Sequence, residues 1–185
     1  MRGRMVRPVV LAVLLLLLIP GSSVLAAGDQ SGSDSARAMT GITHIVNAGT
    51  AWVPELRTKF SQWKPFGWGT QAKVKAAGVG YQWVHIPLTY MSYFDGTPTK
   101  LTYVEFCAKS SNGALTKPVT MDVWDNDVRI LSDPITWPAD NAFHCWGHDF
   151  GAGAWHAGVG ITVQLYFANT TDSITLYKAW AEIQP

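Results

Sequence analysis

Hydrophobic and polar positions alternate with a period of two through much of the second half of the chain. In residues 161–167, apolar side chains at the odd positions alternate with polar or amphipathic ones at the even positions. This period is that of a half-buried β-strand, because successive side chains of a strand point to opposite faces. Further runs rich in aromatic and β-branched residues, which favour strands, lie at 82–88, 101–108, 142–150 and 173–183.

A hairpin is predicted between residues 119–124 and 127–131, because Asp125 and Asn126 tolerate the positive φ of a tight turn. Glycine and proline separate the remaining runs, and 53–63 has room for no more than a short helical turn. About eight short strands at this spacing predict an all-β fold, an antiparallel β-sandwich that is jelly-roll-like.

The first residues have the pattern of an export signal. Arg2, Arg4 and Arg7 precede an apolar run at 9–19, and small residues follow near position 26. We therefore expect a signal peptide over 1–26, a flexible leader over 27–41 and a single β-sandwich domain over 42–185, in a secreted, extracellular protein. An uncleaved N-terminal anchor is the alternative, but the run is shorter than the roughly 20 residues of a spanning helix.

The chain has two cysteines, Cys107 and Cys145. In an exported protein such a pair predicts a disulfide, which here would stabilise the fold by about 4 kcal/mol on the chain-entropy model. A redox pair is the alternative, but it usually has a Cys-x-x-Cys spacing. The spacing of this pair favours a structural bridge.

The charge balance argues against charged partners. The full chain has 14 basic and 13 acidic residues, and without the first 26 residues 11 basic ones remain against 13 acidic ones. No basic stripe is available to neutralise the phosphates of a nucleic acid, and no polybasic membrane patch appears. We therefore predict no nucleic-acid partner and favour a neutral ligand.

Neither a metal site nor a cofactor site is predicted. His144 and His148 would share one face of a helix, but along a strand they lie roughly 13 Å apart, too far to bind one ion together. The oxygen-bearing side chains around Asp125 lack the glycine and terminal glutamate of an EF-hand loop. A hairpin turn explains them better.

No catalytic constellation appears either. The chain lacks a Gly-x-Ser-x-Gly elbow and a phosphate-binding loop, and no spacing pairs two of its carboxylates. The sequence therefore favours a protein without enzymatic activity, with no catalytic residue assigned. A hydrolase stays open as an alternative, because catalytic residues are brought together in space rather than in sequence.

Nine tryptophans, all after residue 51, are the most unusual feature of the composition. Trp combines a large apolar ring with one N–H donor and serves both cores and ligand-binding surfaces. Trp83, Trp124 and Trp180 lie on predicted strands and are assigned to core or sheet-face packing. Trp52 and Trp137 are left unassigned. Four lie beside glycines and turns and are the predicted ligand-binding residues: Trp63, Trp68, Trp146 and Trp155.

These features lead to a hypothesis about function. A secreted, non-catalytic binding module would use loop aromatics to contact a neutral ligand, with a glycan or other cell-surface ligand as the expected partner. Loop aromatics that fold back to close the ends of the sandwich are the structural alternative. Two other functions remain open: a structural protein that self-associates in the extracellular space, and a β-sandwich that inserts aromatic loops into a membrane.

Overall fold

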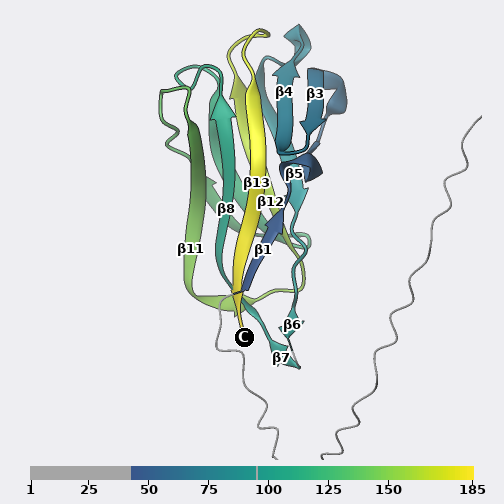
Figure 1. Cartoon of the computed structure of the whole chain (residues 1–185), viewed down its shortest axis with the longest axis vertical. Helices are drawn as coiled ribbons and strands as arrows, with labels where there is room; N and C mark the ends of the chain where they lie inside the picture. The colour runs from purple at the N-terminus through teal and green to yellow at the C-terminus, as the bar shows by residue number, and fades with distance from the viewer. Residues whose placement is uncertain (1–42, 95) are drawn as a thin grey trace, which may run out of the picture. The chain divides into compact units, whose positions relative to one another are not determined.

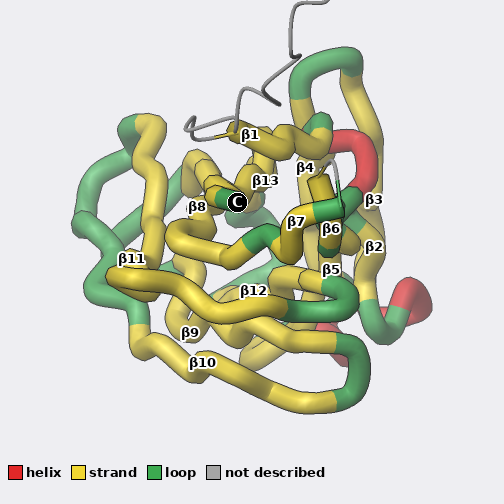
Figure 2. The backbone as a smooth tube through the Cα atoms, turned by 90° about the horizontal axis from the view of Figure 1, so that it is seen from below, coloured by secondary structure: helices red, strands yellow, loops and turns green. Residues whose placement is uncertain are grey.

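The chain folds into two antiparallel β-sheets that pack face to face (Figures 1 and 2). The computed structural model describes residues 43–94 and 96–185. The predicted signal peptide and leader lie outside the described residues. Among the described residues no helix is long and apolar enough to cross a membrane.

Sheet A has the strand order β11-β8-β13-β4-β3. In addition, β1 pairs with the part of β13 that does not pair with β4. Its strands are β1 (Thr43–Asn47), β3 (Phe60–Phe66), β4 (Gly69–Val74), β8 (Lys100–Ser110), β11 (Phe143–Trp155) and β13 (Ile174–Gln184). Sheet B has the order β10-β9-β12-β5-β2. Its strands are β2 (Val53–Pro54), β5 (Gly80–Pro87), β9 (Lys117–Asp125), β10 (Val128–Pro134) and β12 (Val159–Phe167). A small hairpin of β6 (Tyr93–Phe94) and β7 (Thr97–Pro98) extends from one end (Figure 1).

Eight of these strands have the connectivity of a jelly roll. The order β4-β13-β8-β11 in sheet A faces the order β5-β12-β9-β10 in sheet B, so the chain crosses repeatedly between the sheets. Within this set only β9 and β10 follow one another as a hairpin in the same sheet. The predicted antiparallel, jelly-roll-like β-sandwich is therefore confirmed.

The core lies between the inner faces of the two sheets. Alternate residues of each long strand point inward, as Val104 and Phe106 do in β8 and Ile161 and Val163 do in β12. Trp52 and Trp137 join this core. Trp52 donates a hydrogen bond to the Tyr177 carbonyl at 2.8 Å, which satisfies its buried N–H group.

Alternation, aromatic and β-branched content and the hairpin turn together predicted seven strands correctly: β5, β8, β9, β10, β11, β12 and β13. The predicted turn also forms, and Asn126 adopts a positive φ of 52°. Within residues 53–63 a single 3-10 turn (Arg57–Lys59) lies between β2 and the start of β3. The β3–β4 hairpin was missed because its edge strand contains Lys64 and Pro65 and has no clear alternation.

Cys107 and Cys145 form the predicted disulfide, which links directly opposed positions of β8 and β11. Because these sulfurs are bonded to each other, the nearby Glu105 has no thiolate with which to share a metal ion. His144 and His148 do not meet, and each pairs with its own carboxylate, Asp140 or Asp133.

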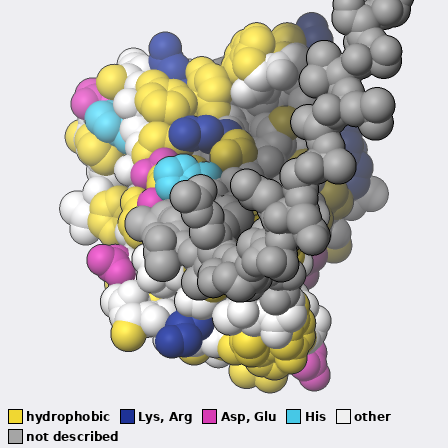
Figure 3. Space-filling model, turned by 60° about the horizontal axis from the view of Figure 1, so that its bottom comes forward, with side chains coloured by type: hydrophobic (Ala, Val, Ile, Leu, Met, Phe, Trp, Pro, Cys, Tyr) yellow, Lys and Arg dark blue, Asp and Glu magenta, His cyan; other side chains and the backbone are white. Residues whose placement is uncertain are grey.

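On the visible part of the end that carries β6 and β7, charged side chains are scattered among hydrophobic ones (Figure 3).

Candidate functional site

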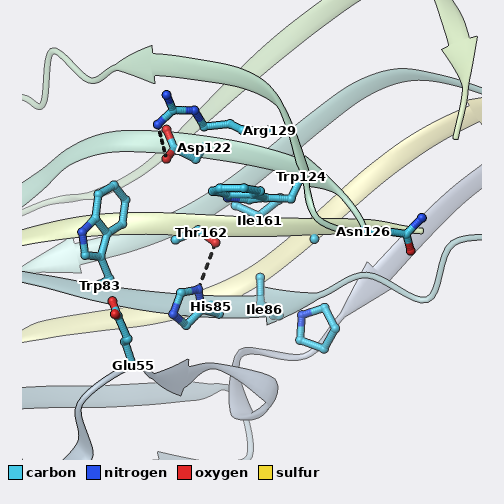
Figure 4. Close-up of a pocket in the computed structure, with 12 residues that line it drawn as sticks. Glu55, Trp83, His85, Ile86, Asp122, Trp124, Asn126, Arg129, Ile161 and Thr162 are labelled. Carbon is cyan, nitrogen blue, oxygen red and sulfur yellow. Dashed lines mark hydrogen bonds and ion pairs between the residues drawn. The ribbon is translucent and has the colours of Figure 1, made fainter. Parts of the chain in front are cut away.

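A groove of about 620 Å³ lies on the outer face of sheet B. Strands β5, β9, β10 and β12 provide most of its lining, and the turn after β2 adds Glu55 (Figure 4). Its side chains comprise two tryptophans, several hydrogen-bonding groups and one cation. The lining residues are Glu55, Trp83, His85, Ile86, Pro87, Asp122, Trp124, Asn126, Arg129, Gly160, Ile161 and Thr162.

The period of two places these side chains on one surface. In β12 the odd residues point into the core, so Gly160 and Thr162 point outward. Thr162 lies opposite His85 of β5 on one side and Asp122 of β9 on the other. Cross-strand neighbours of this kind share a face of the sheet, so the three polar residues form a strip across it.

Trp83 and Trp124 lie on different sides of this polar strip (Figure 4). Trp124 is opposite Gly160, and Trp83 is opposite Gln164. A Cβ atom on Gly160 would meet its nearest neighbour, the Ile86 carbonyl, at an ordinary 3.8 Å. Backbone packing therefore does not require glycine here. The glycine at position 160 instead leaves open space beside the Trp124 ring.

The polar strip is only partly saturated with hydrogen bonds. His85 Nδ1 and Thr162 Oγ1 are 3.0 Å apart. Asp122 is 3% exposed, and its Oδ2 accepts a long hydrogen bond of 3.4 Å from Arg129 Nη1. Its Oδ1 has no hydrogen-bond partner among the described residues. A buried carboxylate oxygen without a partner is costly, because it has lost its hydration without gaining a hydrogen bond.

At the end of the groove beside Trp124, the Asp125 carboxylate forms several hydrogen bonds. Its Oδ1 accepts hydrogen bonds from the Ala157 and Gly158 N–H groups at 3.0 Å, and its Oδ2 lies 3.1 Å from His156 Nδ1. Burial raises the pKa of the Asp125 carboxyl. The hydrogen bonds from Gly158, His156 and Ala157 outweigh this effect and hold the pKa below its usual range.

The predicted binding residue Trp68 lies in the β3–β4 turn and is 56% exposed, but its ring is stacked. The Trp68 centroid is 4.9 Å from that of Phe66 and 5.3 Å from that of Tyr177. Phe66 and Tyr177 belong to strands on either side of β4. The exposed ring of Trp68 is therefore stacked on aromatic neighbours from both strands.

The other three predicted residues lie in strands rather than loops. Trp63 belongs to β3 and packs edge-on against Phe60, with ring centroids 5.0 Å apart. Trp146 packs against the core from β11 and donates to Asp133 Oδ2 at 3.0 Å. Trp155 ends β11 and is 45% exposed, with its N–H group bonded to the Ser92 carbonyl. The structure does not bring the four together.

The two tryptophans of the groove, Trp83 and Trp124, belong to the group that the sequence pattern assigns to core or sheet-face packing. Trp83 and Trp124 are only half-buried, and neither stacks on another aromatic ring among the described residues. Trp180, the third of that group, does pack on the outer face of sheet A, where its N–H donates to Glu105 at 2.6 Å. The alternation of side chains along the strand could have located Trp83. Its neighbour Val84 is buried, so the side chain of Trp83 points to the other face, out of the core.

Comparisons with known proteins give a likeness at the level of the solved structures. No family model and no curated protein matches the chain. A family 29 carbohydrate-binding module from Piromyces equi aligns with 76% of this chain and 91% of its own, at 9% identity and a TM-score of 0.43. The C-terminal family 6 carbohydrate-binding module of the laminarinase LamC from Zobellia galactanivorans aligns with 78% of this chain and 100% of its own, at 8% identity and a TM-score of 0.44.

A third structure is the family 36 carbohydrate-binding domain of a xylanase from the hindgut metagenome of Trinervitermes trinervoides. It covers 76% of this chain and 96% of its own, at 11% identity and a TM-score of 0.40. At this level of similarity no binding residue is transferred to the present chain. The groove itself is therefore the basis for assigning a function.

Proposed function

We propose that the protein is a non-catalytic module that binds a neutral glycan in the groove on the outer face of sheet B. The observation that carries the proposal is the pairing of two unstacked tryptophans, Trp83 and Trp124, with the polar strip between them. A sugar ring has an apolar C–H face and a rim of hydroxyl groups. The tryptophan rings suit the face, and the strip suits the rim.

The polar strip offers both donors and acceptors. Arg129 has further N–H groups that can donate to a sugar hydroxyl. Thr162 and His85 add groups of either kind. A polyhydroxylated ligand can therefore use several hydrogen-bonding groups of the strip at once.

The charges of the groove favour a neutral ligand. Glu55 and Asp122 contribute two carboxylates and Arg129 one guanidinium group, which is already engaged with Asp122. A uronic acid or phosphate would bring a negative charge close to this buried carboxylate, and like charges at short range repel. The same balance gives no attraction for nucleic acid.

The predicted role of Trp63, Trp68, Trp146 and Trp155 concerns other surfaces of the molecule and stays a prediction. Secretion is likewise part of the proposal. It is supported by the disulfide between Cys107 and Cys145, since such bonds persist in oxidising compartments.

Affinity electrophoresis of the purified protein through gels containing neutral or uronic polysaccharides tests the proposal. We expect at least one neutral polysaccharide to retard the protein, and the Trp83→Ala/Trp124→Ala double variant to migrate freely. Unchanged migration on every polysaccharide, or retardation that survives the double substitution, would contradict it. The same incubations are assayed for new reducing ends, because hydrolysis would instead make the groove, with Glu55 and Asp122, an active site.

Two parallel measurements address the other functions considered. Light scattering at high protein concentration detects self-association through the sheet edges, and flotation with lipid vesicles detects membrane insertion. Assembly or flotation without any binding to polysaccharide would replace the proposal.

A further inference from the structure

Aromatic residues on the outer face of sheet B continue beyond the groove. Tyr166, the last outward residue of β12, lies opposite Tyr81 of β5. Their ring centroids are 5.0 Å apart, and Tyr81 is 62% exposed. Neither tyrosine lines the groove described above, yet both belong to strands that form its floor.

The aromatic residues follow one another along β12. Trp124 is level with Gly160, Trp83 with Gln164 and Tyr81 with Tyr166. At about 3.3 Å per residue, Trp83 lies about 13 Å and Tyr81 about 20 Å along the strand from Trp124. A pocket for one sugar would gather its aromatic rings around a point, whereas these extend for about 20 Å along the sheet, from Trp124 on β9 across β12 to Trp83 and Tyr81 on β5.

Polar residues occupy the rows between these rings. Thr162, with Asp122 and His85 on either side, lies between the rows of Trp124 and Trp83. In the row of Trp83, Gln164 lies opposite Thr120 of β9. Apolar rings and hydrogen-bonding groups therefore recur along one direction. A ligand that matches this arrangement has to repeat an apolar face and a polar rim along its own length.

We propose that the ligand is a linear polysaccharide that lies along β12, from Trp124 across the polar strip to Trp83 and on to the Tyr81–Tyr166 pair. This inference rests on the proposed glycan-binding function and extends it from one sugar to a run of sugar units. Tyr81 and Tyr166 then form an additional subsite, which only longer chains reach. The strand direction sets the direction of the bound chain.

Isothermal titration with an oligosaccharide series, from the disaccharide to the hexasaccharide of a polysaccharide that retards the protein, tests this inference. We expect the affinity to rise with each unit until the chain spans the line of aromatic residues. Tyr81→Ala should weaken hexasaccharide binding about five- to tenfold, the scale of one aromatic contact. It should leave the disaccharide unaffected. Tyr166→Ala should act in the same way.

Phe143→Ala is the matched control, since Phe143 is a 49% exposed aromatic residue in β11 of sheet A. It should leave every affinity unchanged, and melting curves check that all variants are folded. Equal affinities for the disaccharide and hexasaccharide, or full hexasaccharide affinity in both tyrosine variants, would overturn the inference. If the Trp83→Ala/Trp124→Ala double variant still lost binding in that case, the proposed function would stand without it. Absence of all glycan binding would remove both.

Discussion

The two outer faces of the sandwich use tryptophan in opposite ways. On sheet A, Trp68 is more than half exposed, but its ring stacks on Phe66 and on Tyr177. On sheet B, Trp83 and Trp124 are less exposed, yet neither has an aromatic ring stacked on it among the residues that the structure describes. Exposed area and aromatic stacking are therefore separate properties of a tryptophan. The binding rings that we propose are those without a stacked aromatic neighbour and beside hydrogen-bonding groups.

The largest effect is expected from the tryptophans of the groove. Trp83→Ala and Trp124→Ala should each weaken glycan binding by about 30-fold, because central aromatic contacts commonly contribute about 2 kcal/mol or more. Titration calorimetry measures this, with melting temperature as the control for folding. A loss in Trp68→Ala that equals the loss in Trp83→Ala would break the distinction between the two faces.

Removing the charge of the polar strip should have the next largest effect. Asp122→Asn keeps the size of the side chain but weakens its interaction with Arg129, which lines the groove. We expect binding to fall about tenfold, the range of a hydrogen bond to a charged group. Asp127→Asn, in the exposed turn between β9 and β10, is the matched control and should change nothing. Equal effects of the two substitutions would contradict a role for Asp122.

On sheet A we expect an effect on stability alone. Trp68→Ala removes two stacked ring contacts and should lower the free energy of unfolding by about 1 kcal/mol, and the melting temperature by about 4 °C. Glycan affinity should be unchanged. A variant with the parental melting temperature and reduced affinity would show that Trp68 binds ligand, as the sequence suggested.

The smallest effect concerns the end of the groove. Because the pKa of Asp125 is lowered in the folded protein, its contribution to stability is complete above the unfolded pKa of about 4 and is lost as the pH falls through the folded value. Urea unfolding at several acidic pH values should therefore show a weaker loss of stability in Asp125→Asn than in the parent. Parallel curves would mean that the hydrogen bonds to Ala157, Gly158 and His156 contribute nothing through this charge.

The sequence predicted the long strands because their two faces differ in polarity. Residues 161–167 alternate strictly, and the structure buries every odd position. The edge strand β3 has no such contrast, since Lys64 and Pro65 interrupt it, and it was missed. The disulfide followed from the presence of two cysteines, and the structure explains it by their opposed positions in β8 and β11.

The groove was harder to predict because it depends on which strands are neighbours. Alternation shows that Trp83 and Thr162 point outward, but no local pattern places β12 between β5 and β9. That order comes from the jelly-roll connectivity. Interpreting the glycines beside Trp68 as a sign of exposure was correct for its surface area, but no local pattern indicated that Tyr177, over 100 residues away, would stack on the ring.

The same strand order has a consequence for folding kinetics. The hydrogen-bonding contact between His85 and Thr162 joins residues 77 positions apart, and neither β5 nor β9 can meet β12 until most of the chain has been made. Pairings this distant in sequence form slowly, on a scale of milliseconds to seconds. The groove therefore exists only in the completed fold. A ligand bound there stabilises that state alone and slows its unfolding without guiding its formation.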